Sequence, residues 1–259
     1  MNCNICSYQS IPWGTALILG KYNVSYYRCA KCGFVQTDSP FWLNEAYSSA
    51  ITKSDIGLVN RNLILAKITQ SLILSVFDCN SDFIDFGGGY GLLVRLMRDA
   101  GMHFYRHDKY CENLFAKGFD APDKTDKTYE MLTAFEVLEH LPDPLIEIEK
   151  MLKYSSSIFF STILLPKNNP KPGEWWYYGV EHGQHVSLYS RASLDIIAST
   201  FNLKLYSHGN SFHLLTTKSI SPLWFSVVCR SRIAPLIRMS LATRLNSKSL
   251  IQTDYANVT

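Results

Sequence analysis

The sequence lacks any apolar run close to the roughly 20 residues that a membrane-spanning helix needs. Glycine and proline are few, 14 and 10 in 259 residues, and no segment has the low-complexity composition typical of disorder. Charged residues make up only 18% of the chain and apolar residues 47%, which is enough for a packed core. These features predict one large folded domain, or one such domain with a small appendage.

Acidic residues are nearly missing from the end of the chain. The stretch from Lys218 to Thr259 holds six basic residues and one acid, Asp254, although the whole chain has a net charge of only +3. The remainder is slightly acidic and has no general nucleic-acid footprint, so we expect no nucleic-acid partner. Apolar residues and arginines alternate in this tail, broken at Pro235. It either contacts an anionic membrane surface or packs on the rest of the protein with its arginines solvated.

The first ten residues are polar and hold two cysteines, unlike a secretory signal peptide, so we expect a cytoplasmic protein with reduced cysteines. Two cysteine pairs, Cys3 with Cys6 and Cys29 with Cys32, each have two residues between their members. This double spacing favours a tetrahedral zinc site over two disulfides or free thiols, and four thiolates make such an ion structural. The remaining cysteines are solitary, and we expect them to be buried packing residues: Cys79, Cys111 and Cys229.

Strand-like and helical stretches alternate from residue 82 onward, which predicts a parallel sheet with helices on both faces. A long loop (165–187), a helix (191–201) and a closing hairpin that ends near residue 217 follow. We divide the chain into a zinc-ribbon-like module (1–40), a helical lead-in (41–77), an α/β domain (78–218) and a basic amphipathic segment (219–259).

A glycine-rich turn follows the first of these strands and opens a helix. Asp85 lies at the end of the strand, and the turn contains four glycines, Gly87, Gly88, Gly89 and Gly91. Glycines here let a ligand approach the backbone, but the third glycine of the dinucleotide pattern and the lysine of a P-loop are both missing. Asp108 ends the next strand, where a carboxylate can accept hydrogen bonds from both ribose hydroxyls of an adenosine-containing ligand.

Together with the segment 134–144, Ala-Phe-Glu-Val-Leu-Glu-His-Leu-Pro-Asp-Pro, these features resemble the class I S-adenosylmethionine-dependent methyltransferases over about residues 45–217. The resemblance implies a Rossmann-like seven-stranded α/β sheet whose last strand is antiparallel. It implies that Asp85 and the glycines hold the methionine end and ribose of S-adenosylmethionine, and that Asp108 holds the ribose hydroxyls. By the same resemblance, Phe135 and Glu136 line the pocket. Tyr47 lies in a segment that closes over the cofactor, or is a helix packing residue, and Phe119 is a guess for the adenine contact.

The loop 165–187 follows the fifth strand of that family's sheet and can reach the carboxyl edge, where ligands bind. Its aromatic run, residues 175–178, forms either a stacking platform for a sugar ring or a packing plug. Methyl transfer must align an acceptor, exclude water and often remove a proton, for which histidine is suited. We take Glu181, His182 and His185 as candidate catalytic residues; the alternative is that the histidines are hydrogen-bonded structural residues.

The cysteine pairs, the sheet and the segment Gln184 to Ser187 together are similar to zinc-containing sugar methyltransferases, in which the corresponding histidine, here His185, is the candidate base. This chain has Gln184 where that group has glutamate, and it lacks the additional C-terminal domain of sugar C-methyltransferases. We therefore expect O-methylation of a small-molecule acceptor, a sugar or glycan precursor. The alternatives are a non-catalytic binding or assembly protein and an RNA methyltransferase. No feature of the sequence sets an oligomeric state.

Overall fold

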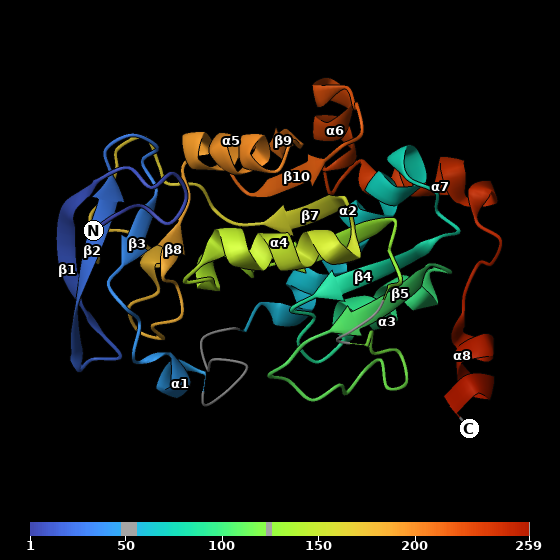
Figure 1. Ribbon diagram of the computed structural model, residues 1–259. Coiled ribbons are helices and arrows are strands. Elements are labelled where there is room, and N and C mark those ends of the chain that lie inside the picture. The colour runs from blue at the N-terminus through green and yellow to red at the C-terminus, as the bar shows by residue number, and fades with distance from the viewer. Residues whose placement is uncertain (48–55, 123–125, 259) are drawn as a thin grey trace.

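The computed structural model describes residues 1–47, 56–122 and 126–258, which fold around two sheets (Figure 1). The larger sheet has the strand order β5-β4-β6-β7-β10-β9. Strands β4 to β7 are parallel, and β10 runs antiparallel to both of its neighbours, so the expected α/β fold with an antiparallel last strand is confirmed. The strands are β4 (Asp82–Phe86), β5 (His103–His107), β6 (Met131–Phe135), β7 (Ser157–Ser161), β9 (Lys204–His208) and β10 (Phe212–Thr216).

Helices cover both faces of this sheet because successive residues of a strand point to opposite sides. In β4, Phe83 joins a core shared with α2 and α3, whereas Ile84 joins the core shared with α4 and α5. Both side chains are fully buried, which explains why the strands read as short continuous apolar runs. The four helices are α2 (Leu58–Val76), α3 (Leu92–Asp99), α4 (Pro144–Tyr154) and α5 (Arg191–Thr200).

The described residues form six strands of this sheet, not the seven that the resemblance implied. Beyond β5, the place of a further strand is taken by one isolated parallel bridge between Arg106 and Asp120. The stretch around this bridge contains Gly118, Pro122 and several charged residues, a composition that disfavours a regular strand.

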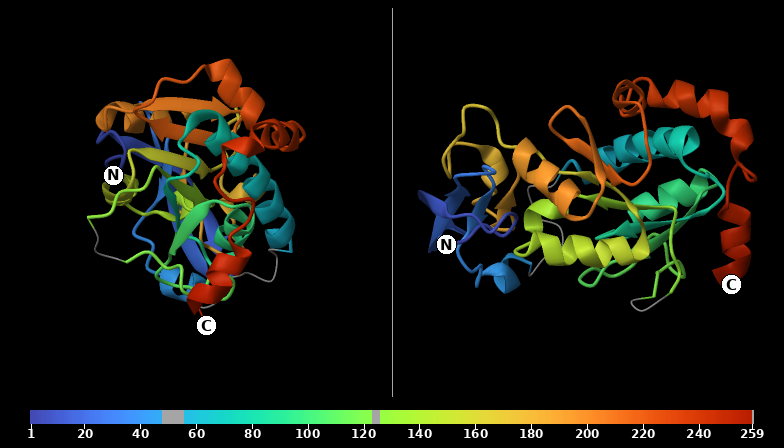
Figure 2. Two further views of the ribbon diagram at one scale, coloured as in Figure 1. Left: turned by 90° about the vertical axis from the view of Figure 1, so that its right-hand side faces the viewer. Right: turned by 45° about the horizontal axis from the view of Figure 1, so that its top comes forward.

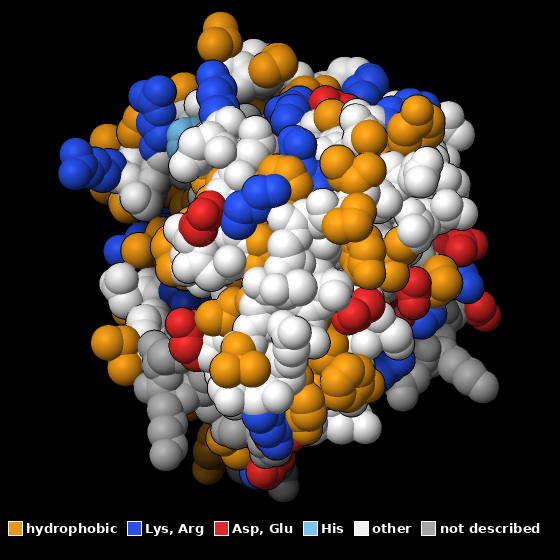
Figure 3. Space-filling model, turned by 90° about the vertical axis from the view of Figure 1, so that its left-hand side faces the viewer, with side chains coloured by type: hydrophobic (Ala, Val, Ile, Leu, Met, Phe, Trp, Pro, Cys, Tyr) orange, Lys and Arg blue, Asp and Glu red, His pale blue; other side chains and the backbone are white. Residues whose placement is uncertain are grey.

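The N-terminal residues form a second, four-stranded sheet in the order β1-β2-β3-β8. Its last strand, β8 (Ser187–Leu188), comes from the end of the long loop and pairs antiparallel with β3 (Val35–Thr37). The cysteine module and the histidine-bearing loop are therefore held together by backbone hydrogen bonds. The other two strands are β1 (Ser10–Ile18) and β2 (Tyr22–Cys29). Seen from this end of the molecule, apolar side chains are spread among charged and polar ones (Figure 3).

The C-terminal residues form short helices along the α2 side of the larger sheet (Figure 2). They are α6 (Pro222–Val228), α7 (Ala234–Leu241), the single turn η3 (Ala242–Arg244) and α8 (Ile251–Val258). Both α6 and α7 pack against α2. Within the described ranges, no helix combines the length and the apolar character needed to cross a membrane.

Candidate active site

The glycine turn between β4 and α3 forms one wall of a cavity of about 120 Å³ at the carboxyl edge of the larger sheet. Six of the predicted cofactor-binding residues line it: Asp85, Gly87, Gly88, Gly89, Phe135 and Glu136. The opposite wall is the start of α2, with Leu58 and Asn62, which the sequence did not single out. Small-molecule sites usually measure about 300–1,000 Å³, so this cavity has to widen to admit an adenosine derivative.

Two features of position 89 favour glycine: the backbone has a left-handed conformation, and the residue lines the cavity, where a side chain would occupy ligand space. Its φ is +52°, and a Cβ placed there would meet no atom within 4 Å. Gly91 differs, because a Cβ there would lie 2.8 Å from Asn113 Oδ1, and the residue does not line the cavity. Its place in the cofactor site stays a prediction, and its positive φ allows α3 to begin close against residues 113–116.

Asp85 presents a buried carboxyl group to the cavity. Thr133 donates a hydrogen bond from Oγ1 to Asp85 Oδ1 at 2.6 Å. Burial raises the pKa of Asp85 to about 7, so the group carries a partial charge near neutral pH. A cationic ligand group in this cavity would stabilise the ionised form.

Asp108 lies beside the glycine turn, as expected, but its carboxylate is largely occupied by backbone amides. Gly89 N donates to Oδ2 at 2.9 Å, while Tyr110 N and Cys111 N donate to Oδ1 at 2.8 Å each. A carboxylate has about four acceptor positions. Asp108 thus fixes the shape of the turn and has about one position left for a ligand hydroxyl, rather than the two that the resemblance implied.

Arg106 is a buried residue of this site that the sequence analysis missed. Its Nε donates to Gly89 O and its Nη1 to Asp120 Oδ1, both at 2.6 Å, and its Nη2 donates to Cys111 O. One guanidinium therefore joins the glycine turn, the loop after β5 and the isolated bridge. The available signal was an arginine within the short strand His-Phe-Tyr-Arg-His, two residues before Asp108.

Glu136 holds a strained backbone at the end of β6. Its φ is +54°, a left-handed conformation that is uncommon for residues other than glycine. The Ser161 hydroxyl stabilises it by accepting from Glu136 N at 2.9 Å and donating to Glu136 Oε1. Such strain is commonly retained where a side chain has to face a ligand. Phe135, the preceding residue, packs edge-on against Phe159.

Tyr47 bridges the cofactor side of the site to a group of histidines. Its hydroxyl hydrogen-bonds to His140 Nδ1 at 2.9 Å, and its ring stacks on Tyr110, in the loop that Asp108 holds. Tyr47 is not among the residues that line the cavity. It follows α1 (Leu43–Ala46) and is the last described residue before residues 48–55, which lie outside the described ranges.

Three histidine rings form an edge-to-face cluster: His140, the last residue of the turn η1 (Leu138–His140), His182 and His185. The His185 ring lies 4.9 Å, centroid to centroid, from each of the other two. His185 Nδ1 donates to the Tyr177 carbonyl at 2.6 Å, so Nε2 carries the lone pair of the neutral ring, and no described residue donates a hydrogen bond to it. Burial lowers the pKa of His185 to about 4, so the ring is neutral at physiological pH.

The other two catalytic candidates have different surroundings. His182 Nδ1 accepts a hydrogen bond from Gln184 N at 3.2 Å, and its ring covers Gly179. Glu181 is exposed and makes no hydrogen bond or ion pair with any described residue. The structure therefore brings the two histidines together and leaves Glu181 outside their hydrogen-bonded cluster.

The buried residue Glu139 lies beside this histidine cluster. Tyr177 Oη donates to Glu139 Oε1 at 2.7 Å, while Glu139 Oε2 is buried and has no hydrogen-bond partner among the described residues. Burial, with Glu136 nearby, raises the pKa of Glu139 to about 8. Ligand atoms of Glu139, His140 and His185 lie within 4.8 Å of one another, but Tyr47 and the Gln184 backbone already hydrogen-bond His140.

The aromatic run of the long loop was expected to be either a stacking platform or a packing plug, and its members differ in this respect. Tyr177 and Tyr178, both in η2 (Trp176–Tyr178), are fully buried and pack in the core of the N-terminal sheet. Trp176 is 73% exposed, and its ring contacts that of Tyr177. The tyrosines are therefore packing residues, and Trp176 alone offers a free face.

Two sequence-based assignments near the cavity are corrected. Phe119 is buried in the core, where the Arg98 guanidinium lies 3.6 Å from its ring centre, so it does not face the cavity as an adenine contact would. Cys111 is partly exposed and lines the cavity, whereas Cys79 and Cys229 are buried as expected.

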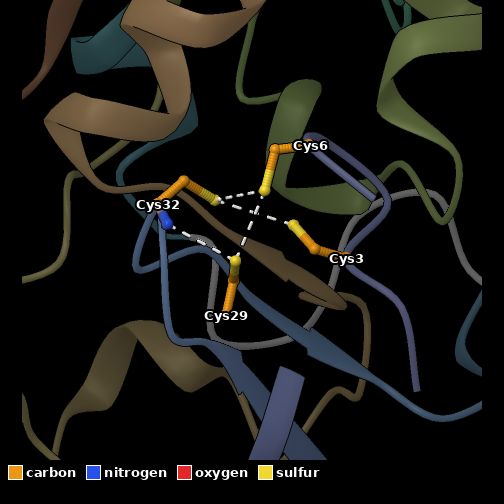
Figure 4. Close-up of side chains that lie close together, drawn as sticks. All are labelled: Cys3, Cys6, Cys29 and Cys32. Atoms are coloured by element: carbon orange, nitrogen blue, oxygen red, sulfur yellow. Dashed lines mark hydrogen bonds between the residues drawn. The ribbon is translucent and has the colours of Figure 1, made fainter. Parts of the chain in front are cut away.

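The four N-terminal cysteines converge on one point (Figure 4). Their sulfurs approach to 3.4 Å (Cys6 with Cys29), 3.6 Å (Cys3 with Cys32) and 3.7 Å (Cys6 with Cys32). Sulfurs bound about 2.3 Å from a tetrahedral ion stand about 3.8 Å apart, whereas a disulfide needs about 2.05 Å. Ile5 N and Cys32 N donate to Cys3 and Cys29 Sγ at 3.4 Å, so these amides are placed to stabilise thiolates. The arrangement fits a four-thiolate metal site and excludes disulfides.

The model of a methyltransferase-domain family matches residues 60–208. Among solved structures, magnesium protoporphyrin IX methyltransferase from Synechocystis PCC 6803 with bound S-adenosylhomocysteine is 13% identical, covering 67% of this chain and 90% of that one, with a TM-score of 0.46. The plantazolicin methyltransferase BpumL is 12% identical, covering 80% and 87%, with a TM-score of 0.48. Human N-acetylserotonin methyltransferase is 13% identical, covering 70% and 60%, with a TM-score of 0.46. The comparison with curated proteins gave no match.

The family match covers more than half of the chain. It includes the glycine turn, Asp108 and the segment from Phe135 to His140, which carry the resemblance to this family. It does not depend on the weaker likeness to individual structures. The chain belongs to the class I S-adenosylmethionine-dependent methyltransferases.

Proposed function

We propose that this methyltransferase transfers a methyl group to a hydroxyl of a small molecule, a sugar or glycan precursor. The observation that carries the proposal is the neutral His185 ring, whose Nδ1 is fixed by the Tyr177 carbonyl and whose Nε2 is free to accept a proton. The ring belongs to a cluster that also includes His140, four residues after the cavity-lining Glu136.

The cavity residues fit S-adenosylmethionine, which supplies an electrophilic methyl group on a sulfonium centre. The cofactor carries an ammonium group and a sulfonium, and the cavity offers two carboxyl groups, Asp85 and Glu136. The open backbone at Gly89 allows close approach, and the remaining acceptor position of Asp108 suits a ribose hydroxyl. Arg61 lines the same cavity, and its guanidinium suits the carboxylate of the cofactor's methionine end.

His185 has the protonation state that O-methylation requires. As the acceptor oxygen bonds to the methyl carbon, the bond from that carbon to sulfur breaks and the hydroxyl proton passes to His185 Nε2. The oxygen becomes strongly acidic while it gains the methyl group, so a base whose pKa lies near 4 can accept its proton. Tyr177 holds the imidazole in the tautomer that leaves Nε2 free.

The surroundings of His185 support a sugar as the acceptor. The Tyr177 ring contacts both the His185 ring and the ring of the exposed Trp176, at centroid distances of 4.7 and 5.3 Å. An exposed indole that one tyrosine ring separates from the histidine suits the apolar face of a pyranose ring.

The four-cysteine cluster supports a structural zinc ion in the same proposal. Cys3, Cys6, Cys29 and Cys32 would supply all four ligands and leave no open position for chemistry. Because Ser190 Oγ donates to Cys32 O, the ion would stabilise the contact between the N-terminal module and the start of α5. It would thereby help to place β8 and the histidine loop.

A single-turnover assay with methyl-labelled S-adenosylmethionine tests the proposal. The acceptors are nucleotide-activated sugars and simple glycosides, with a mixed RNA as comparison. We expect label in a sugar, a rate about 10²–10⁴-fold lower for His185→Gln, and unchanged cofactor binding by that variant. His208→Gln, a partly exposed histidine hydrogen-bonded to Ser226, is the matched control and should leave the rate unchanged. Label in RNA only, or equal rates for His185→Gln and the wild type, would contradict the proposal.

A further inference from the structure

A second hollow, sharing no lining residue with the cofactor cavity, lies between α2 and the C-terminal helices. Its volume is about 620 Å³. Every residue around it is apolar, small or cationic, and none is acidic. The residues that matter for its chemistry are Lys67, Pro235, Arg238, Met239, Leu245 and Lys248. We call it the basic groove.

The basic groove exists because α7 buries only one of its faces. Ala234 and Ile237 point inward and are buried, and the helix packs on α2, as one interpretation of the tail predicted. Arg238 and Met239, on the other face, are exposed. One face of α7 is therefore buried against the α/β domain, and the opposite face is exposed to solvent.

The two helices that line the groove also carry large apolar side chains that project into solvent, of which Met239 lines the groove itself. On α7, Leu236 is 61% exposed and Met239 75% exposed. On α2, Val59 and Leu63 are 58% and 43% exposed and lie on the same helix face as Lys67, at successive four-residue steps. Single exposed apolar residues are normal, but a group of them beside a hollow marks an interaction surface.

The positive charge of the groove is not neutralised within the described part of the chain. No acidic group there forms an ion pair with Lys67, Arg238 or Lys248. The one acid of the tail, Asp254, is buried and pairs with Arg98 and Arg95 instead. The groove thus combines uncompensated cations with exposed apolar side chains.

We propose that the basic groove and the adjoining faces of α2 and α7 dock on a membrane surface of anionic phospholipids. Lys67, Arg238 and Lys248 would meet headgroup phosphates, while Leu236 and Met239 enter the boundary of the acyl chains. A free phosphate would use the cations but not the apolar side chains. The juxtaposition of both on two neighbouring helices therefore favours a lipid surface.

Co-sedimentation of the full chain with vesicles tests this docking. One set of vesicles contains phosphatidylcholine and phosphatidylglycerol in equal parts, and the other contains phosphatidylcholine alone. We expect binding to the anionic vesicles only, weakened by salt. Arg238→Ala with Lys248→Ala should weaken it about 25-fold, at roughly fivefold for each cation. Leu236→Ser with Met239→Ser should weaken it about tenfold.

The matched controls remove equally exposed residues elsewhere: Leu17→Ser in β1 and Lys117→Ala in the loop after β5. Both should bind the anionic vesicles as the wild type does. No sedimentation of the wild type with anionic vesicles would overturn the proposal, as would unchanged binding by the groove variants. Calorimetric binding of inorganic phosphate without vesicle binding would show that the groove takes a free anion instead.

Discussion

Gly89 N donates a hydrogen bond to Asp108 Oδ2 at 2.9 Å, which ties the glycine turn after β4 to the end of the neighbouring strand β5. Arg106 reinforces the link by donating to Gly89 O from the same strand. The two features that the sequence presented as separate binding groups are therefore one preorganised unit. Preorganisation of this kind lowers the entropic cost of binding a ligand.

Gly89→Ala should abolish cofactor binding at a small cost in stability. A Cβ at this position meets no protein atom, so the fold loses only about 1–2 kcal/mol to left-handed strain, while the methyl group fills space that the ligand needs. Gly20→Ala is the matched control, because Gly20 also has a positive φ and open space around it. Urea unfolding should show similar losses for both variants. Calorimetry should show loss of S-adenosylmethionine binding for Gly89→Ala alone; equal affinity in both would refute the contact.

Asp85→Asn should change how stability depends on pH in the ligand-free protein. Burial raises the folded pKa of Asp85 to about 7, above its usual 3.8, so the unfolded state ionises first and stability falls as pH rises between these values. The full effect is about 4 kcal/mol at 1.36 kcal/mol per pKa unit. We expect the free energy of unfolding from urea titrations at pH 5 and pH 8 to fall less in Asp85→Asn than in the wild type. Asp195→Asn, an exposed residue, should behave like the wild type, and a parallel fall in all three proteins would rule out the buried carboxyl.

Cys29→Ser should remove a bound zinc ion and destabilise the N-terminal sheet. Elemental mass spectrometry should find about one zinc per chain in the wild type, because four cysteine sulfurs converge in the N-terminal module. Cys229→Ala, a buried cysteine outside the cluster, is the control and should keep its zinc. Metal-free wild-type protein with an intact fold would disprove the site.

Asp254→Ala should release α8 from the α/β domain. Asp254 accepts two hydrogen bonds from Arg98, at 2.6 and 2.8 Å, and both side chains are buried. Removing one partner leaves the other buried and unpaired, which costs about 3–5 kcal/mol. The exposed pair of Arg191 and Asp195 is the control, because Asp195→Ala should cost well under 1 kcal/mol. Similar melting temperatures for the two variants would show that the tail is not held this way.

The sequence predicted the parts of this protein whose chemistry is local. Two cysteines separated by two residues form a knuckle whatever surrounds them, and a glycine turn between a strand and a helix exposes its backbone. The family segment from Glu136 to Pro144 spans nine consecutive residues, so a short stretch of sequence carries it. For the same reason, the order of elements in the α/β domain was correct.

The errors arose where distant segments meet. Val35 pairs with Leu188 across most of the chain, and no short pattern encodes that partnership. Asp108 accepts from Tyr110 N and Cys111 N in a local turn of the kind that aspartate favours, but its bond from Gly89 N joins two segments 19 residues apart. Phe119 faces Arg98 in the core rather than a ligand, a contact between residues 21 positions apart that no local pattern encodes.

Isothermal titration calorimetry of S-adenosylmethionine against the wild type and Asp108→Ala tests the central claim most directly. The claim is that the cavity at the end of β4, shaped by Asp108, holds the methyl donor. Hydrogen bonds to charged groups contribute about 1.5–3 kcal/mol, so we predict one site per chain in the wild type and at least about tenfold weaker binding by Asp108→Ala. No binding by folded wild-type protein, or equal affinity in the two proteins, would contradict it.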